Sequence, residues 1–351
     1  MLLYIILGIL CFGLLIAVHE WGHFITAKKL DVQVNEFSIG MGPALWTRQR
    51  GETQYSLRAF PVGGYCAMEG EDIDTEGNPR SFAAKPLWRK LIILAAGSFM
   101  NLVAGFVLVA VLFTAIGSYA VPVIDSLAEG CPAAGILEPG DRVLSVDGHR
   151  IAVYNDVSQA LSAGEEEKTF VIRRDGEKLT LTDVPLPLQD YTEGGQTIRR
   201  YGITFRKEEA TLLGVLVQSA RTCDYFARAV WDGLAMLIRG QVGLSDMSGP
   251  VGIVSYLGEA GSKGPSVAGG VQNVLYVVAL IAVNLAIMNM LPIPGLDGGR
   301  IFLLIVGELW FLVTRRRLDP KYEAYLNGIF LVLLMGFMAL ITFSDVWKLV
   351  K

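Results

Sequence analysis

Charged residues are scarce in this chain, and long stretches have none. Only 18% of the 351 residues are charged, whereas 52% are hydrophobic. Stretches without Asp, Glu, Lys or Arg that are long enough for about 20 helical residues are Met1–Val18, Leu91–Ile124, Gly264–Leu296 and Ala324–Ser344. This distribution is atypical of a soluble domain and predicts a polytopic α-helical membrane protein with four transmembrane helices.

Other absences narrow the function further. The first apolar stretch has no basic residue before it and no small-residue cleavage site after it, so we expect a membrane span and not a cleaved signal peptide. The net charge of -4 gives no support for nucleic-acid binding. The four cysteines include no C-x-x-C pair and do not support a cysteine metal site. Cys131 and Cys223 would share the outer side, either as a disulfide or as free thiols.

Histidine is also rare, and its placement is informative. Two of the three histidines lie in His19-Glu20-Trp21-Gly22-His23, at the end of the first apolar stretch. Positions four apart on a helix differ by about 40° of rotation, so both imidazoles project from one face and can hold one metal ion. Glu20 can then reach a metal-bound water, as in the H-E-x-x-H zinc metallopeptidases. A chance match is the alternative, but ionisable groups at membrane depth are costly unless paired or metal-bound.

The third apolar stretch ends in a segment that cannot remain helical. Pro292, Pro294 and Gly295 interrupt the backbone hydrogen bonds, so we expect the helix to unwind there. Asp297 is the first charged residue after this stretch. Two histidines and one carboxylate leave a fourth position for water, as catalytic zinc requires. The alternative is that Asp297 only caps a helix or marks the membrane boundary.

The basic residues predict the orientation. They gather after the first and third spans, which the positive-inside rule places in the cytoplasm, with both termini and the long middle segment outside. His19 lies roughly 26 Å along the first helix, near the cytoplasmic side. The basic residues of these two loops include Lys28, Lys29, Arg48, Arg50, Arg58, Arg80, Lys85, Arg89, Lys90, Arg300, Arg315, Arg316, Arg317 and Lys321.

Short strand patterns follow the histidine motif. Val32–Ile39 and Gln54–Ala59 alternate in polarity, with turn residues at Gly40-Met41-Gly42-Pro43 and Pro61–Tyr65. They predict a small sheet, either an ordinary cytoplasmic hairpin or a re-entrant β-loop whose edge could pair with an unwound substrate.

Asn101, in the second apolar stretch, is a polar residue at membrane depth. It either stabilises helix packing or contacts substrate.

The middle of the chain reads as a separate β-rich domain. Short strand-like runs alternate with turn signals such as Glu138-Pro139-Gly140-Asp141 and Asp147-Gly148. The segment Pro132–Leu137 together with Pro139–Gly148 resembles a PDZ domain, a fold that captures peptide ends between a strand and a helix. After it, helical periodicity over residues 210–247 predicts an amphipathic helix at the outer membrane surface.

These motifs occur in the order seen in site-2 proteases. Over essentially its whole length the chain resembles a bacterial intramembrane zinc metalloprotease of the regulator-of-sigma-E type. The resemblance rests on His19–His23, Gly97–Asn101, the PDZ-like segment, Gly249–Ile253 and Asn289–Gly298. It departs from relatives in having one PDZ-like unit where some have two, and Ser98 where many have proline.

The resemblance implies roles for individual residues. His19, His23 and Asp297 would hold one Zn²⁺, and Glu20 would be the general base. The residues that would hold the substrate strand are Asn289, Gly40, Met41 and Gly42. Asn101 is a further candidate for substrate binding, on account of its polarity at membrane depth and not of the resemblance. The expected substrates are membrane proteins cleaved within or near a transmembrane segment, such as anti-sigma factors or signal-peptide remnants, after a first cut by another protease.

The resemblance also implies a setting, the bacterial inner membrane, with the lipid bilayer and transmembrane substrates as partners and a peptide as a possible ligand of the PDZ-like unit. We therefore expect a four-span α-helical membrane protein with a membrane-associated β-loop and one extracytoplasmic PDZ-like domain. The expected boundaries are 1–30 for the first span, 31–90 for the β-sheet and loop, 91–120 for the second span, 121–208 for the PDZ-like domain, 209–262 for the amphipathic helix and linker, 263–300 for the third span, 301–323 for a cytoplasmic amphipathic segment and 324–351 for the fourth span.

Two functions from other classes remain open. A non-catalytic scaffold would use only the PDZ-like unit to bind peptide tails, and it predicts that Glu20→Gln has no measurable effect. A metal transporter would use the same ligands for passage and predicts metal flux in vesicles. The sequence has one such site and no relay of acidic or histidine residues, which disfavours transport.

Overall fold

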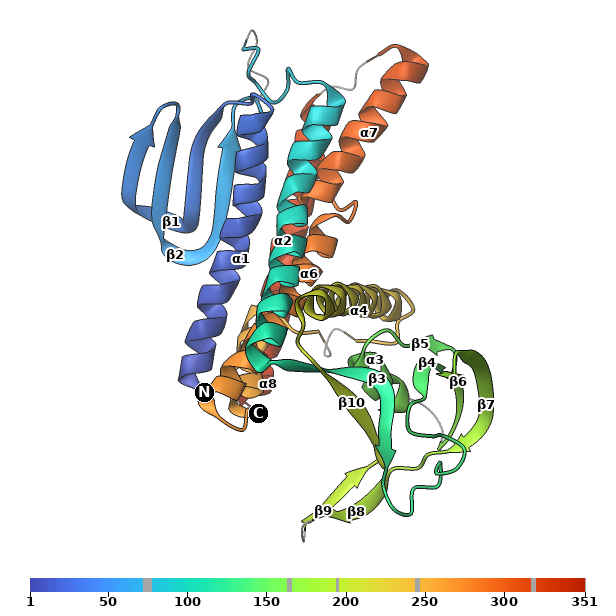
Figure 1. Ribbon diagram of the computed structural model, residues 1–351. Coiled ribbons are helices and arrows are strands. Elements are labelled where there is room, and N and C mark those ends of the chain that lie inside the picture. Colours follow the sequence, from blue (N-terminus) through green and yellow to red (C-terminus); the bar gives the residue numbers. More distant parts are fainter. Residues whose placement is uncertain (72–77, 163–165, 194–195, 244–246, 317–319, 351) are drawn as a thin grey trace. The chain divides into compact units, whose positions relative to one another are not determined.

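The computed structural model describes residues 1–71, 78–162, 166–193, 196–243, 247–316 and 320–350. The chain divides into two compact units, residues 1–108 with 229–351 and residues 109–228. The boundaries between the units fall within helices α2 (Leu87–Ile116) and α4 (Leu212–Ile238), which are labelled in Figure 1.

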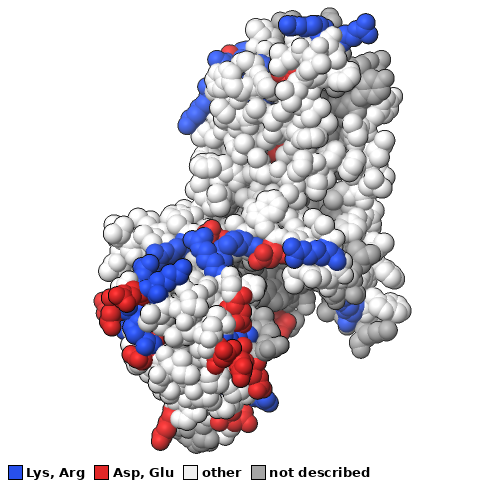
Figure 2. All heavy atoms as spheres, turned by 90° about the vertical axis from the view of Figure 1, so that its right-hand side faces the viewer, with Lys and Arg blue, Asp and Glu red and all other residues white. Residues whose placement is uncertain are grey.

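Four helices of the described residues are long and apolar enough to cross a membrane, as the charge-free stretches predicted. On the face of the first unit that Figure 2 shows, charged side chains are few over a broad area, which suits contact with lipid. These helical segments are Leu2–Lys29 (α1), Leu87–Ile116 (α2), Val267–Asn289 (α6) and Gly328–Lys348 within α8 (Pro320–Val350).

The helix ends differ from the charge-free stretches. Helix α2 ends at Ile116, because Gly117 takes a φ of +77° and strand β3 (Ser118–Leu127) follows at once. Helix α6 ends at Asn289, and the expected unwinding over the prolines separates it from α7 (Asp297–Thr314). An amphipathic segment was expected at 301–323; the helix found there begins earlier, and residues 317–319 lie outside the described ones.

Glycines allow α1, α5 (Pro250–Ser262) and α6 to pack closely. A Cβ atom on Gly261 would lie 2.3 Å from the ring of Tyr4, and one on Gly8 would lie 2.7 Å from Leu257. Buried apolar side chains of the three helices then form a common core, in which Leu15, Leu257 and Val278 are almost completely covered.

Strands β1 (Val34–Arg50) and β2 (Thr53–Met68) form a sheet beside α1. Both strands bend, so that residues 36–39 pair with 54–57 on one side, and residues 34–39 pair with 64–68 on the other. Gly40 and Gly42 make the bend with φ of +85°, and a Cβ on Gly40 would lie 2.5 Å from the carbonyl oxygen of Phe60. Residues 64–68 therefore form one edge of this sheet.

A cluster of ion pairs fastens the β1–β2 turn to the end of α1. Glu52 lies in the turn and binds both Arg80 and Lys28, which hold the pKa of its carboxyl at about 2. Arg80 and Lys85 also bind Asp31, directly after α1. These contacts connect the sheet, α1 and the segment before α2.

The second unit contains a sheet of order β10-β3-β4-β6-β7, with β5 paired to β4, and a separate β8–β9 hairpin. Its core is formed by side chains such as Ile124, Val143, Phe170 and Ile172, all fully buried. Cys131 and Cys223 are both free thiols, which excludes the disulfide alternative for this structure. The remaining elements are β4 (Arg142–Val146), β5 (His149–Arg150), α3 (Tyr154–Ser162), β6 (Glu167–Arg174), β7 (Glu177–Pro185), β8 (Gln189–Glu193), β9 (Gln196–Arg200) and β10 (Ile203–Glu209).

Within the first unit, a buried carboxylate links the last helix to α5. Asp345 is 3% exposed, and its Oδ2 accepts hydrogen bonds from the backbone nitrogens of Gly249 at 2.9 Å and Gly252 at 2.8 Å. These donors lie at the N-terminus of α5, where the positive end of the helix dipole favours a negative charge. The Gly249-Pro250-Val251-Gly252 segment thus supplies the hydrogen-bond donors for the Asp345 carboxylate.

We predict that Asp345→Leu destabilises the protein. Two buried backbone donors would lose their acceptor, at a cost of about 1 to 3 kcal/mol in the free energy of unfolding. Thermal unfolding of the purified chain in detergent measures the effect. Asp345→Asn keeps an acceptor oxygen and should lose less; a leucine variant as stable as the wild type would contradict this role.

Candidate active site

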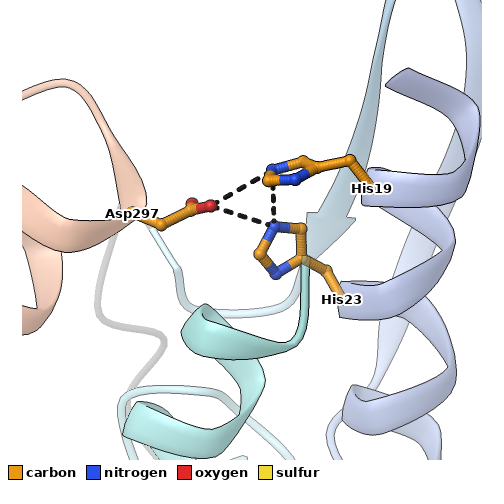
Figure 3. A group of neighbouring side chains, drawn as sticks. All are labelled: His19, His23 and Asp297. Carbon is orange, nitrogen blue, oxygen red and sulfur yellow. Dashed lines mark hydrogen bonds and ion pairs between the residues drawn. The ribbon is translucent and has the colours of Figure 1, made fainter. Parts of the chain in front are cut away.

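Helix α1 carries two histidines on one face, as the four-residue spacing predicted. The Nε2 atoms of His19 and His23 lie 3.2 Å apart. Both residues are buried, with 8% of His19 and 6% of His23 exposed. The ring planes are inclined at 82°, so both Nε2 atoms face the same point (Figure 3).

Asp297 reaches that point from the start of α7. Its Oδ2 lies 3.1 Å from Nε2 of His19 and 3.3 Å from Nε2 of His23 (Figure 3). The turn before α7 is tight: a Cβ on Gly298 would lie 2.3 Å from the backbone of Met290, and one on Gly299 would lie 2.1 Å from the carbonyl oxygen of Ile293. The glycines after Asp297 therefore let the unwound segment fold back and aim the carboxylate at the histidines.

The three side chains fit a divalent metal ion. One ligand atom from each lies within 4.8 Å of the others, and no second such group of three occurs among the residues that the structure describes. Asp297 Oδ2 is buried and makes no well-formed hydrogen bond. Two imidazole nitrogens and one carboxylate oxygen are a donor set that zinc accepts, with a fourth position left for water.

Helix α2 lies against the same group. A Cβ on Gly97 would lie 2.3 Å from Nε2 of His23 and 2.7 Å from Cε1 of His19, so only glycine leaves room here. The outer nitrogen of each ring also faces α2: Nδ1 of His23 is 2.8 Å from the carbonyl oxygen of Ile93, and Nδ1 of His19 is 3.2 Å from the amide of Asn101.

Glu20 and the three candidate ligands line a common cavity of about 380 Å³. Its carboxylate accepts a hydrogen bond from the backbone of Cys66, on the sheet edge formed by residues 64–68. Burial raises the pKa of the Cys66 thiol. The residues that line the cavity are His19, Glu20, His23, Tyr65, Cys66, Ala67, Met68, Glu71, Leu94 and Asp297.

An ion pair joins one residue of the cavity wall to α7. Glu71 follows β2 and binds Arg300, which lies one turn after Asp297 on α7. Glu71 Oε2 also lies 3.4 Å from the backbone nitrogen of Met68. The pair is partly buried, with 15% of the Glu71 and 28% of the Arg300 side chain exposed, and it ties the end of the sheet edge to the helix that carries Asp297.

Other candidate residues lie elsewhere. Asn289 ends α6, and Gly40, Met41 and Gly42 lie in the bend of β1; none of these four lines the cavity. Asn101 is 1% exposed and packs against His19. The sequence reasoning missed Glu71 and the Tyr65–Met68 edge, because strand pairing, which has no local signal, brings them to the histidines.

The sequence is similar to those of known proteins. Residues 7–337 match the model of peptidase family M50. A Clostridium perfringens protein whose name places it among the zinc metalloproteases is 34% identical over 348 residues, and the alignment covers 98% of each chain. The regulator of sigma-W protease RasP of Bacillus subtilis is 26% identical over 428 residues, and zinc metalloprotease RasP of Geobacillus kaustophilus is 28% identical over 429, each covering 98% of both chains.

The family match includes the histidine motif on α1, the α2 helix and the Asp297 turn. The Clostridium perfringens and Geobacillus kaustophilus relatives are named as zinc metalloproteases. The apolar helices agree with a multi-pass membrane protein. The chain therefore belongs to peptidase family M50, the site-2 proteases, and is a zinc metalloprotease.

Proposed function

We propose that His19, His23 and Asp297 bind one zinc ion per chain, and that the protein cleaves peptide bonds within or near transmembrane segments of membrane proteins. The observation that carries this proposal is the convergence of the three ligand atoms at a cavity inside a unit of apolar helices. Zinc bound there would lower the pKa of a water molecule toward 7 and polarise the scissile carbonyl.

Glu20 is the proposed general base. It lines the same cavity as the three ligands, next to His19 in the chain. It accepts the proton of the attacking water and passes it to the leaving amine, so that one carboxylate serves both steps. The hydrogen bond from the Cys66 backbone holds this carboxylate at the cavity wall.

The substrate would be held as a strand. A transmembrane helix hides its carbonyl groups in internal hydrogen bonds and must unwind before it can be attacked. Residues 64–68 pair with β1 on one side only, and Tyr65, Cys66, Ala67 and Met68 line the cavity. Strand addition at this edge would present substrate backbone to Glu20. Asn289 and the Gly40-Met41-Gly42 bend would support the substrate farther from the ligands.

The proposed orientation follows the basic residues. Lys28, Lys29, Lys85 and Arg89 lie at the end of α1 and the start of α2, and Arg315 and Arg316 follow α7. These ends would face the cytoplasm of a bacterium, with both termini and the second unit outside the inner membrane.

Residues 121–208 are proposed as a PDZ-like domain. Strand β10 lies at the edge of its sheet, and a groove of about 430 Å³ is lined by Tyr154, Val157 and Leu161 of α3 and by Ile203 and Phe205 of β10. Such a groove suits a peptide end, so the domain would bind or sort substrates already shortened by another protease, such as anti-sigma factors or signal-peptide remnants.

We predict that Glu20→Gln lowers the cleavage rate of a single-span membrane substrate by about 10²- to 10⁴-fold. The amide has the size of the carboxylate but cannot take up the proton, and it is not a proposed ligand, so the zinc content should stay at one per chain. Cleavage on gels and zinc by atomic absorption measure the two effects. Unchanged cleavage would show that Glu20 is not the general base.

We predict that chelation of zinc abolishes cleavage, and that added zinc restores it in the wild type but not in His19→Ala. The alanine variant lacks one of three ligands, so it should bind zinc at least about 10-fold more weakly. Equilibrium dialysis measures the bound metal. Full zinc retention in the variant would contradict the ligand assignment.

The Glu71–Arg300 ion pair should couple the sheet edge to the Asp297 helix. We predict that Glu71→Gln and Arg300→Gln each slow cleavage, and that the double variant is little slower than either single one, with a coupling of about 0.5 to 3 kcal/mol. Glu259→Gln, which breaks the exposed pair with Lys263, is the matched control and should change nothing. Additive effects of the two substitutions would show that the pair does not act as a unit.

A further inference from the structure

Three residues of α2 lie in one row beneath the histidines. Ile93, Gly97 and Asn101 are spaced four apart and therefore share a face of the helix. The backbone carbonyl of Ile93 contacts His23, and the side-chain amide of Asn101 contacts His19. Gly97 lies between them and, having no side chain, leaves room for both imidazole rings. We call these residues the α2 row.

In each ring, the nitrogen that carries the proton determines which nitrogen has a lone pair for the metal. A proton on Nδ1 leaves the lone pair of Nε2 directed at the metal position. An imidazole that binds a metal through Nε2 carries its proton on Nδ1, and that N–H needs an acceptor. For His23 the acceptor is the carbonyl oxygen of Ile93, 2.8 Å away. That carbonyl is accessible because Gly97, the residue one turn later on α2, has no side chain to cover it.

For His19 the corresponding position is taken by Asn101. The amide is 3.2 Å from Nδ1, the residue is 1% exposed, and its Oδ1 is buried without a hydrogen-bond partner. A half turn of the amide exchanges its oxygen and nitrogen. With the oxygen toward His19, Oδ1 accepts the Nδ1 proton and the Nε2 lone pair faces Asp297 and His23.

We propose that Asn101 is a positioning residue, which holds His19 in the tautomer and orientation that bind zinc, and is not a substrate contact. This inference rests on the proposed function, because it assumes that His19 is a zinc ligand. Asn101 is not among the residues that line the cavity, so a substrate strand there would not reach it. The α2 row thereby provides both imidazoles with an acceptor from one helix.

The test measures zinc affinity of the full chain in lipid nanodiscs, by competition with a chromogenic chelator. Asn101→Leu keeps the size of the side chain and removes the acceptor, so zinc should bind about 10- to 100-fold more weakly. Asn101→Asp keeps an acceptor and cannot donate from its carboxylate, so it should bind zinc at least as tightly as the wild type. Ser98→Ala, at a buried position three residues earlier on α2, is the control and should match the wild type.

The outcomes separate a positioning role from the alternatives. A leucine variant with wild-type zinc affinity and a raised KM would make Asn101 a substrate contact and overturn the proposal. An aspartate variant that binds zinc more than about 10-fold more weakly would also overturn it, even if the leucine variant does not fold, which circular dichroism would reveal. His19→Ala, measured alongside, tests the ligand assignment itself: if it retains zinc, the proposed function fails independently of Asn101.

Discussion

The first unit depends on one convergence, that of two imidazoles from α1 with the carboxylate of Asp297 from α7. The three candidate ligands come from nearly opposite ends of the chain. They meet because glycine residues allow the backbones of the elements that carry them to pack closely against their neighbours. Gly22 brings α1 against Ala96 of α2, and Gly298 folds the turn before α7 onto Met290. Side chains at these places would push apart the elements that carry the ligands.

This convergence places polar groups in an apolar environment, where each needs a partner. The imidazoles obtain theirs from α2, and Glu20 obtains one from the edge of the β1–β2 sheet. The sheet is in turn fixed by Glu52 at its turn and by Glu71 at its end. The β-hairpin, α2 and α7 therefore act together as the support of a small polar site.

Much of this site could be predicted from local sequence. The spacing of His19 and His23 dictates a common helix face, and the prolines before Asp297 require a break in the third apolar stretch directly before that carboxylate. The four spans followed from the charge-free stretches. By contrast, the end of α2 at Ile116 was not anticipated, because residues 118–124 carry no charge and so extend the charge-free stretch, although only Gly117 separates the helix from the strand.

Residues whose positions depend on strand pairing or on contacts between distant helices were harder to predict. The edge at 64–68 reaches the site because β1 and β2 both bend, and the Glu71–Arg300 pair joins residues far apart in sequence. Asn101 was noticed as a polar residue in a span, but its neighbour, His19, could be identified only from the packing of α1 on α2.

The bend in the two strands has a consequence for how much of a substrate is engaged. The edge beside the cavity runs only from Gly64 to Met68, about 17 Å at the usual rise of a strand. A hydrocarbon layer is about 30 Å thick. If a substrate polypeptide binds along this edge, roughly half of the length that it spans in the hydrocarbon layer has to be extended. The remaining turns can stay helical throughout hydrolysis.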